Sequence, residues 1–370
     1  MRYTAILAAL ALVLAVVPAA VTGVAAAPGV QQENCSFPFS GTDATGTEVT
    51  VEDRPERIVA LQASTAQILW EVNAQERVVG MPVRSYTAYL NGSESRTDVL
   101  TGDGTSVNVE QVVALEPDVV VAPSSIPNAT VSQLRDAGVT VYKFSFDRSI
   151  EGIYEKTTLL GRLVGNCEEA NATVEEMRSS VERIERAVEG RERPDALYYF
   201  YNFTAGNGTF IHEVITTAGG DNVAANAGIS GFGQISDEVV AERNPDWILH
   251  PSDAPLPQRE PFASTTAYAQ NQTLSVNANY MNQPAPRVVI PMLEIAQALH
   301  PEAFEGGANG TTANETATDE PTTNATDNAT AADPGDPPGE TPTSSGDGPG
   351  FGVVATLVAL LATMLLVRRS

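Results

Sequence analysis

Apolar and polar positions in the first half of the chain follow two alternating patterns. Four short apolar runs predict buried strands at residues 57–61, 78–80, 118–122 and 139–142. Between them, apolar residues three and four apart predict helices, one capped by Ser64 or Thr65 and one over 109–115 that opens at Asn108 with Gln111 as a capping box. A third short helix is predicted over 130–137. This alternation predicts a parallel sheet covered by helices on both faces.

The middle of the chain has one long helical pattern. Apolar residues recur at intervals of four and three from Ala170 to Val188, and charged residues fill the positions between them. The pattern predicts a single amphipathic helix over residues 167–190, on the order of 35 Å long.

A second set of strands and helices follows that helix. Strands are predicted at 195–203 and 246–249, and helices at 213–218, 236–243 and 286–299. Each half of the chain contains a helix, a Pro-Asp stop and an apolar strand, around Pro117 and again around Pro245. The predicted fold class is therefore α/β, with two similar α/β lobes that contain parallel-type sheets and are joined by one long rigid helix.

Both ends of the chain have the patterns of export and anchoring. An apolar run from Ala5 to Val17 and small residues up to Ala27 predict a signal peptide. Residues 351–367 carry no charge and precede two arginines, which predicts a membrane-spanning helix with the globular body outside the cell. The predicted organisation is a signal peptide (1–27), an N-terminal α/β lobe (28–146), a helical linker with the long helix (147–193), a C-terminal α/β lobe (194–304), a disordered spacer rich in Thr, Asn and acids (305–348) and a C-terminal tail (349–370).

The composition adds a strong negative charge. Asp and Glu number 46 against 21 Lys and Arg, the net charge is −25, and Lys143 and Lys156 are the only lysines. Such a surface repels nucleic acid and anionic lipid, which excludes a basic-patch binding protein. It is typical of a halophile, because multimolar salt screens the repulsion between the acidic groups.

Cysteines and glycosylation motifs give two further expectations. Two cysteines in an exported chain predict a disulfide between Cys35 and Cys167, although the sequence leaves open whether they lie close together. The density of N-x-S/T motifs predicts some surface glycosylation. The motifs begin at Asn34, Asn91, Asn128, Asn171, Asn202, Asn207, Asn271, Asn309, Asn314, Asn324 and Asn328.

The residues give no constellation typical of an enzyme. His212 and Glu213 begin like a zinc-protease motif, but position 216 is Thr and no second histidine follows. The other histidines, His250 and His300, lie on poorly matched segments. We therefore expect no catalytic residue, no resident metal and no cofactor.

Several short motifs, in this order, resemble the helical-backbone (type III) substrate-binding proteins of ABC importers for cobalamin, siderophores and haem. The motifs are PERIVAL at 55–61, ERVVG at 76–80, the segment 109–121, GRLVG at 161–165, GGDNV at 219–223, QISDE at 234–238 and AQALHP at 296–301. The resemblance covers residues 45–303, and within the class residues 86–89 most resemble cobalamin-binding members. It implies an extracytoplasmic component that binds a corrinoid between its lobes and delivers it to an ABC permease with its ATPase subunits.

Ligand contacts are expected between the lobes, where loops follow the carboxyl ends of the strands. A corrinoid is a large flat ring with amide rims, so aromatic faces and a few hydroxyl or amide groups suit it. Tyr86 and Phe232 are the strongest candidates. The full set of candidates is Gln62, Ser64, Tyr86 and Tyr89 in the first lobe and Tyr201, Phe203, Phe232 and Tyr280 in the second. Nearby arginines (Arg84, Arg259 and Arg287) leave an iron–siderophore or haem ligand open. A ligand-free cell-surface glycoprotein is a further alternative.

The resemblance also implies docking to the permease through one carboxylate on each lobe. Glu238 matches that position in the second lobe. The loop taken as its counterpart, residues 123–130, contains no acid, and Asn128 stands where a glutamate is expected. A helix N-terminus would also favour Glu238 through its dipole, without any docking role.

The C-terminal tail resembles the PGF sorting signal of haloarchaea. The residues that carry this resemblance are Pro349, Gly350 and Phe351, followed by the apolar stretch and the terminal arginines. It implies that an archaeosortase removes the helix and that a lipid anchor replaces it. The alternative is a plain membrane span, and in both cases the lobes stay tethered to the outer face of the cell membrane.

Overall fold

The computed structural model describes residues 35–102 and 104–305. The predicted signal peptide, the spacer from residue 306 onward and the C-terminal tail lie outside these residues. Within them, no helix is both long enough and apolar enough to cross a membrane.

The N-terminal lobe is built on a five-stranded parallel sheet with strand order β5-β4-β3-β6-β7. Its central strand alternates between two cores, because Ile58 and Ala60 pack into one apolar cluster and Val59 into another. This confirms the prediction of a parallel sheet covered on both faces. The strands are β3 (Ile58–Ala60), β4 (Val78–Met81), β5 (Thr97–Asp98), β6 (Val119–Ala122) and β7 (Val141–Lys143), and the helices are α1 (Ala63–Glu71), α2 (Val109–Ala114) and α3 (Asn128–Asp136).

The C-terminal lobe repeats this design with a four-stranded parallel sheet, β10-β8-β12-β13. A separate antiparallel pair, β9 and β11, lies beside it. The strands are β8 (Asp195–Tyr198), β9 (Phe203–Ala205), β10 (Asp221–Asn222), β11 (Phe232–Gln234), β12 (Trp247–Pro251) and β13 (Thr273–Val276). The helices are α6 (Phe210–Thr217), α7 (Val223–Asn226), α8 (Asp237–Arg243), α9 (Thr266–Ala269), α10 (Ala278–Met281), α11 (Val289–Leu299) and α12 (Pro301–Phe304).

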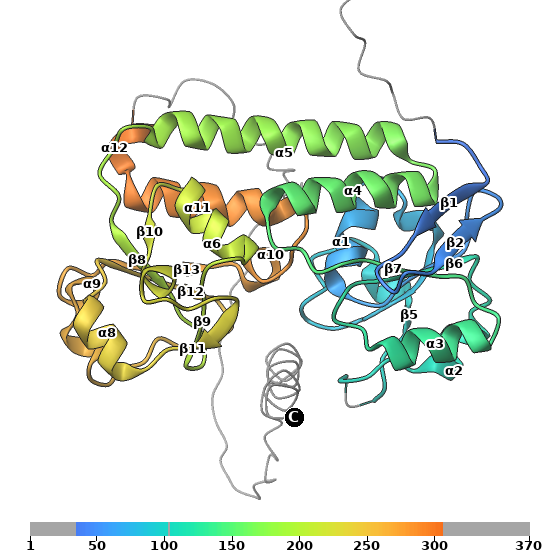
Figure 1. Cartoon of the computed structure of the whole chain (residues 1–370), viewed down its shortest axis with the longest axis horizontal. Helices are drawn as coiled ribbons and strands as arrows, with labels where there is room; N and C mark the ends of the chain where they lie inside the picture. The colour runs from blue at the N-terminus through green and yellow to red at the C-terminus, as the bar shows by residue number, and fades with distance from the viewer. Residues whose placement is uncertain (1–34, 103, 306–370) are drawn as a thin grey trace, which may run out of the picture. The chain divides into compact units, whose positions relative to one another are not determined.

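Two helices, not only the predicted one, connect the lobes. The predicted helix is α5 (Cys167–Val188), and α4 (Ile150–Val164) lies beside it (Figure 1). Ile153 of α4 packs in the core of the C-terminal lobe, whereas Leu160 packs in the core of the N-terminal lobe. A Cβ on Gly161 would lie 2.2 Å from the Cβ of Ala170, so only glycine allows this close approach of α4 and α5.

The helix starts agree with the sequence at α2 and differ from it at α1. The Asn108 side chain accepts a hydrogen bond from the Gln111 N–H at 3.1 Å, as the capping box predicts. The prediction that Ser64 or Thr65 caps α1 is wrong. Gln62 is the N-cap without a side-chain hydrogen bond, and the Thr65 hydroxyl donates instead to the Gln62 carbonyl oxygen.

Three further segments differ from the predictions. The single strand expected at 195–203 is two strands, β8 and β9, because Tyr201 and Asn202 adopt positive φ between them. The terminal helix expected over 286–299 begins as a 3-10 turn, and α12 follows it. The remaining elements are the hairpin β1 (Phe39–Thr42) and β2 (Glu48–Val51) and the 3-10 turns η1 (Gln75–Arg77), η2 (Ser93–Ser95), η3 (Phe262–Ser264) and η4 (Pro286–Val288).

A disulfide joins the start of the described chain to the long helix. Cys35 and Cys167 are bonded, with their Cα atoms 5.7 Å apart, although 132 residues separate them in sequence. The bond fixes the segment before β1 to the first residue of α5.

Candidate functional site

A pair of tyrosines joins the segments that follow the strands of the two sheets. Tyr89 lies in the loop that follows β4, and Tyr280 lies in α10, directly after β13. Their ring centroids are 5.3 Å apart in an edge-to-face arrangement. The loops on which ligand residues were predicted therefore face one another at this point.

Arg287 fastens this junction from the C-terminal side. Its backbone N–H donates to Gln67 Oε1 at 2.9 Å, and its Nε donates to Glu71 Oε1 at 2.6 Å, so it holds two residues of α1. Its guanidinium carbon lies 5.2 Å from the centroid of the Tyr89 ring and 5.8 Å from that of Tyr280, within the range of cation–π attraction. Tyr89 and Tyr280 are thus held in place before any ligand arrives.

The phenol of Tyr89 is part of the same hydrogen-bond network. Gln67 Nε2 donates to the Tyr89 hydroxyl oxygen at 2.7 Å. Burial raises the pKa of Tyr89 to about 12, so the phenol remains protonated and its hydroxyl is free to donate in turn.

A second aromatic pair lies on the ribbon of β9 and β11. Phe232 is paired with Ala205, and Phe203 is paired with Gln234, so the two phenylalanines are diagonal neighbours on one face. Both rings contact Phe200, Phe203 stacked at 6.1 Å and Phe232 edge-on at 6.4 Å. Both side chains are only partly buried, which leaves apolar ring surface at the edge of the core.

The other four predicted residues lie outside these two pairs, Gln62, Tyr86 and Tyr201 outside the helices and strands and Ser64 within α1. Tyr201 is 38% exposed and its hydroxyl donates to the Asp253 carbonyl oxygen at 2.5 Å. Tyr86 is partly buried, and burial raises its pKa. Gln62 is partly exposed at the start of α1, whereas Ser64 is only 5% exposed inside the first turn. Among the described residues, no hydrogen bond or ring contact joins these four to the two aromatic pairs.

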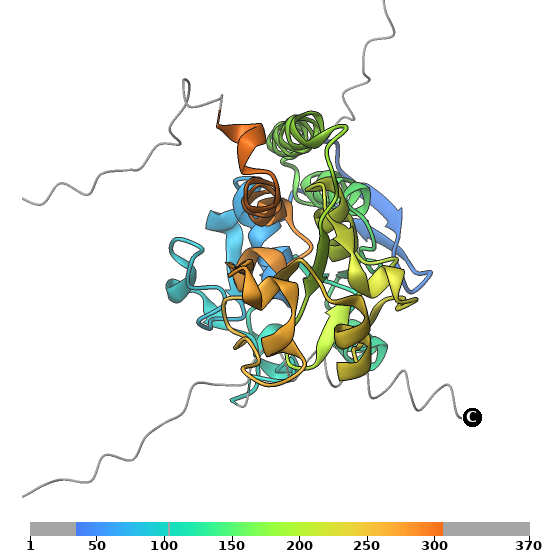
Figure 2. The ribbon, with the colours of Figure 1, turned by 90° about the vertical axis from the view of Figure 1, so that its left-hand side faces the viewer.

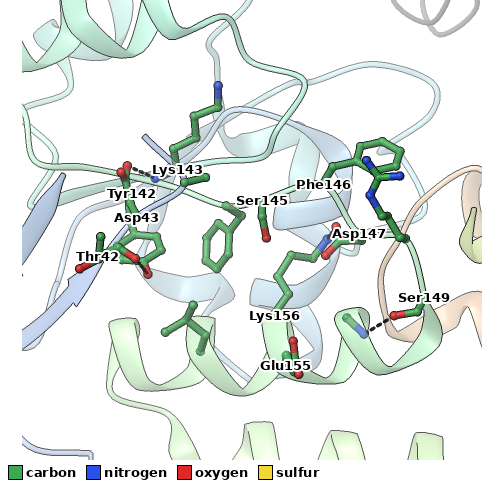
Figure 3. Close-up of a pocket in the computed structure, with 15 residues that line it drawn as sticks. Thr42, Asp43, Tyr142, Lys143, Ser145, Phe146, Asp147, Ser149, Glu155 and Lys156 are labelled. Carbon is green, nitrogen blue, oxygen red and sulfur yellow. Dashed lines mark hydrogen bonds and ion pairs between the residues drawn. The ribbon is translucent and has the colours of Figure 1, made fainter. Parts of the chain in front are cut away.

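A hollow of about 490 Å³ lies elsewhere, on the N-terminal lobe between the β1–β2 turn, the end of β7 and α4 (Figure 3). None of the eight predicted ligand residues lines it. Its buried Lys156 points at Asp147, and Lys156 Nζ also donates to the Pro284 carbonyl oxygen at 2.6 Å. Burial lowers the pKa of Lys156 and raises that of Asp147. The ion pair joins α4 to the linker before it, and the hydrogen bond to Pro284 joins α4 to the segment after α10. The hollow contains none of the predicted ligand residues.

An internal correspondence reveals a carboxylate that the sequence analysis missed. The N-cap side chains of α2 and α8, Asn108 and Ser236, each accept a bond from the N–H three residues later. The residue before each Pro-Asp stop adopts positive φ, Glu116 at 45° and Asn244 at 42°. Each pair of equivalent residues is separated by 128 positions in the sequence. By the same interval, Glu238 on α8 corresponds to Glu110 on α2.

By this correspondence the counterpart of Glu238 is Glu110 and not a residue of loop 123–130, since Asn128 begins α3 and has no place in it. Glu110 and Glu238 are both exposed, each in the first turn of its helix. Hydrogen bonds from its own backbone N–H and from Ser236 lower the pKa of Glu238. The sequence alone could have identified Glu110. If the two Pro-Asp pairs, at Pro117 and Pro245, are aligned, Glu110 and Glu238 both lie seven residues before the proline.

His212, His250 and His300 do not form a metal site in the described part of the chain. The described residues contain no group of three or more His, Cys, Asp or Glu side chains arranged to hold a metal ion. His300 is buried, and its Nε2 lies 3.2 Å from the Gly219 carbonyl oxygen.

Comparison with known proteins assigns the class. Residues 58–287 match the model of a periplasmic binding protein family, and residues 348–369, outside the described part, match the PGF-CTERM motif. The chain is 41% identical over 279 residues to the cobalamin-binding protein of Halobacterium salinarum, covering 72% of this chain and 75% of that protein. It is 26% identical over 289 residues to an uncharacterised ABC transporter substrate-binding lipoprotein of Bacillus subtilis, covering 74% of this chain and 90% of that protein.

A solved structure shares the fold. The periplasmic haem-binding protein RhuT of Roseiflexus sp. RS-1 superposes with a TM-score of 0.60 at 22% identity, over 67% of this chain and 99% of that one. The matched family is one of binding proteins of ABC transporters, not of enzymes, and it acts outside the cytoplasm. The chain belongs to the periplasmic binding protein family.

Proposed function

We propose that this protein binds a corrinoid between its two lobes and delivers it to an ABC permease. The Halobacterium salinarum relative, a cobalamin-binding protein, supports this ligand through 41% identity over most of both chains. The tyrosine pair at the meeting point of the sheets and the phenylalanine pair on the β9–β11 ribbon suit a large flat ring.

One observation carries the choice of ligand class. Each of the three arginines near the predicted loops is already paired with a carboxylate: Arg84 with Asp98, Arg259 with Asp237 and Arg287 with Glu71. An anionic ligand in a partly desolvated site needs an available cation, and each of these arginines already has a carboxylate partner that the ligand would have to displace. Cyanocobalamin has no net charge, so it needs none of them.

A haem or an iron–siderophore complex is the second candidate. The haem-binding protein of Roseiflexus has the same fold, so the fold is compatible with this ligand. To bind the two propionates of haem through Arg287, the guanidinium would have to leave Glu71 and its position near Tyr89 and Tyr280. That rearrangement counts against an anionic ligand.

In the proposed complex the corrin face lies against Phe203 and Phe232 of the C-terminal lobe. Tyr89 and Tyr280 form a fixed wall at the junction of the lobes. Gln62, Ser64, Tyr86 and Tyr201 supply amide and hydroxyl groups for the rim of the ring. Among these, Ser64 is the weakest member, since its side chain is buried.

We further propose that Glu110 and Glu238 dock the two lobes onto arginines of the permease. Both are exposed at equivalent positions of equivalent helices, which a two-fold arrangement of permease subunits would require. The PGF-CTERM motif supports processing by an archaeosortase and a C-terminal lipid anchor on the outer face of the cell membrane. The protein itself would supply no cofactor, because the corrinoid is cargo.

Replacing Phe232 tests the site. We expect Phe232→Ala to weaken cyanocobalamin binding about fivefold to tenfold, through loss of a ring that stacks on the ligand. The measurement is a fluorescence titration of the purified protein in multimolar KCl. Phe146→Ala is the matched control, since Phe146 is a 47% exposed ring that lines the N-terminal hollow, which none of the predicted ligand residues lines.

Thermal unfolding of both variants separates loss of binding from loss of folding. A folded Phe232→Ala protein that binds as tightly as the unchanged protein would remove Phe232 from the site.

A further inference from the structure

The folded chain distinguishes among its glycosylation motifs, which the sequence alone could not do. Six N-x-S/T motifs lie within the described residues, beginning at Asn91, Asn128, Asn171, Asn202, Asn207 and Asn271. Modification of a folded protein needs an accessible Asn amide. The requirement for Ser or Thr two residues later means that this hydroxyl must also be accessible to the enzyme.

In four motifs the hydroxyl is already engaged in the fold. Ser93, Thr204 and Thr209 are no more than 1% exposed, and each donates a hydrogen bond to a carbonyl oxygen. Thr173 lies within α5 and donates to the Glu71 and Glu169 carbonyl oxygens. The motifs at Asn91, Asn202, Asn207 and Asn171 are therefore closed in the folded protein.

The motif at Asn128 is closed at the other end. Asn128 is the first residue of α3, and its side-chain oxygen accepts a hydrogen bond from the buried Lys143 ammonium group. Asn128 is exposed, but to turn its amide to an enzyme it would have to give up this hydrogen bond, which is costly because the lysine is buried.

Asn271 differs from all of these. It is exposed, has a φ of +56° and forms the turn between α9 and β13. Thr273, at the start of β13, is only partly buried, and β13 is an edge strand of its sheet. In the described part of the chain, no hydrogen bond involves the side chain of Asn271 or of Thr273.

The position of Asn271 is compatible with ligand binding. Asn271 precedes β13, whereas Tyr280 follows it, so the two residues lie at opposite ends of this strand. Helix α9 lies on the outer side of the C-terminal lobe in Figure 1, and Figure 2 shows that side of the lobe in front. Asn202, in contrast, lies directly between the candidate residues Tyr201 and Phe203, where a glycan would obstruct the site.

We propose that Asn271 is the N-glycosylation acceptor of the folded lobes. The donor is a lipid-linked saccharide whose first sugar is esterified to phosphate. The Asn271 Nδ2 forms a bond to the anomeric carbon, the bond from that carbon to the phosphate oxygen breaks, the lipid phosphate leaves and Nδ2 loses one proton. The Thr273 hydroxyl takes part in recognition of the motif.

The test is glycopeptide mass spectrometry of the full chain expressed in a haloarchaeal host. We expect the peptide that contains Asn271 to carry a glycan in most copies, and the peptides that contain Asn91 and Asn207 to carry none. Thr273→Ala should abolish the modification. Thr273→Ser is the matched control and should retain it, because it keeps the hydroxyl.

Three results would overturn the proposal. One is an unmodified Asn271, whether or not Asn309 or the later motifs are modified. Another is equal modification of Asn91 or Asn207, which would mean that the fold does not select the acceptor. The third is a glycan on Asn271 that survives Thr273→Ala.

Discussion

At the scale of single residues, buried charges in this protein are held by several partners at once. Asp43, whose side chain is fully buried after β1, accepts hydrogen bonds from Thr45, from the Lys143 N–H and from Arg135. Burial alone would raise the pKa of Asp43, but these hydrogen bonds outweigh it and the pKa is lowered.

The lowered pKa of Asp43 gives a pH prediction. A carboxylate with a lowered folded pKa stabilises the fold above its unfolded pKa of about 4, and this contribution is lost as the pH falls through the folded pKa. We expect Asp43→Asn to lower the free energy of unfolding by about 2 kcal/mol at pH 7. Denaturant unfolding from pH 7 to pH 3 should show the difference from the unchanged protein shrinking below pH 4. A constant difference across that range would contradict this role.

The sequence predicted where single residues lie along the chain better than which side chains they contact. It placed Tyr89 after the predicted strand at 78–80, where the structure has β4, because that strand is visible as an apolar run. It predicted no strand before Tyr280, which follows β13 and lies in α10. It gave no sign that Arg287 would fasten these tyrosines to Glu71, since that contact joins residues 216 positions apart. Hydrophobic periodicity reports on local faces, and pairings of this range depend on the finished fold.

At the scale of elements, the longest helix and the apolar strands were predictable, and most of the short elements were not. The helix α5 and the strands β3, β4, β6, β7, β8 and β12 matched, because sustained periods of 3.6 residues and continuous apolar runs are strong signals. The strands β5, β10 and β13 were not predicted, and the 15-residue helix α4 was anticipated only as part of a helical linker. The ribbon of β9 and β11 was missed, since each strand has three residues and Gly233 interrupts one of them. This ribbon carries Phe203 and Phe232, so its arrangement could not be predicted.

The disulfide is a covalent crosslink between the segment before β1 and the start of α5. It closes a loop that spans 132 positions, and such a crosslink restricts the unfolded chain. We expect replacing Cys35 and Cys167 together by Ser to lower the free energy of unfolding by about 2–5 kcal/mol. Guanidinium titration measures this, and cyanocobalamin affinity serves as the control. An unchanged unfolding midpoint would contradict the stabilising role of the bond.

The correspondence of α2 and α8 makes a prediction about transport. We expect Glu110→Arg and Glu238→Arg each to reduce uptake of labelled cobalamin by cells about tenfold, because charge reversal opposes docking to a basic surface. Cyanocobalamin affinity of the purified variants should not change. Glu242→Arg, at another exposed position of α8, is the matched control. Normal uptake with Glu110→Arg would leave the second lobe as the only docking point.

At the scale of the whole molecule, the two lobes are joined by several independent contacts. Both α4 and α5 link the lobes, and Arg287 and Lys156 add polar contacts between them. A frame of this kind favours small closure around the ligand over a wide hinge motion. With a net charge of −25, we expect the protein to be more stable in multimolar salt, since screening limits the repulsion between acidic groups.

The central claim is that an uncharged corrinoid is the ligand. Isothermal titration of the purified protein with cyanocobalamin, and separately with haemin, in multimolar KCl tests it most directly. We expect saturable one-to-one binding of cyanocobalamin at micromolar affinity or tighter, with much weaker binding of haemin because Arg84, Arg259 and Arg287 are already paired. A folded protein that gives no heat with cyanocobalamin and binds haemin tightly would contradict the account.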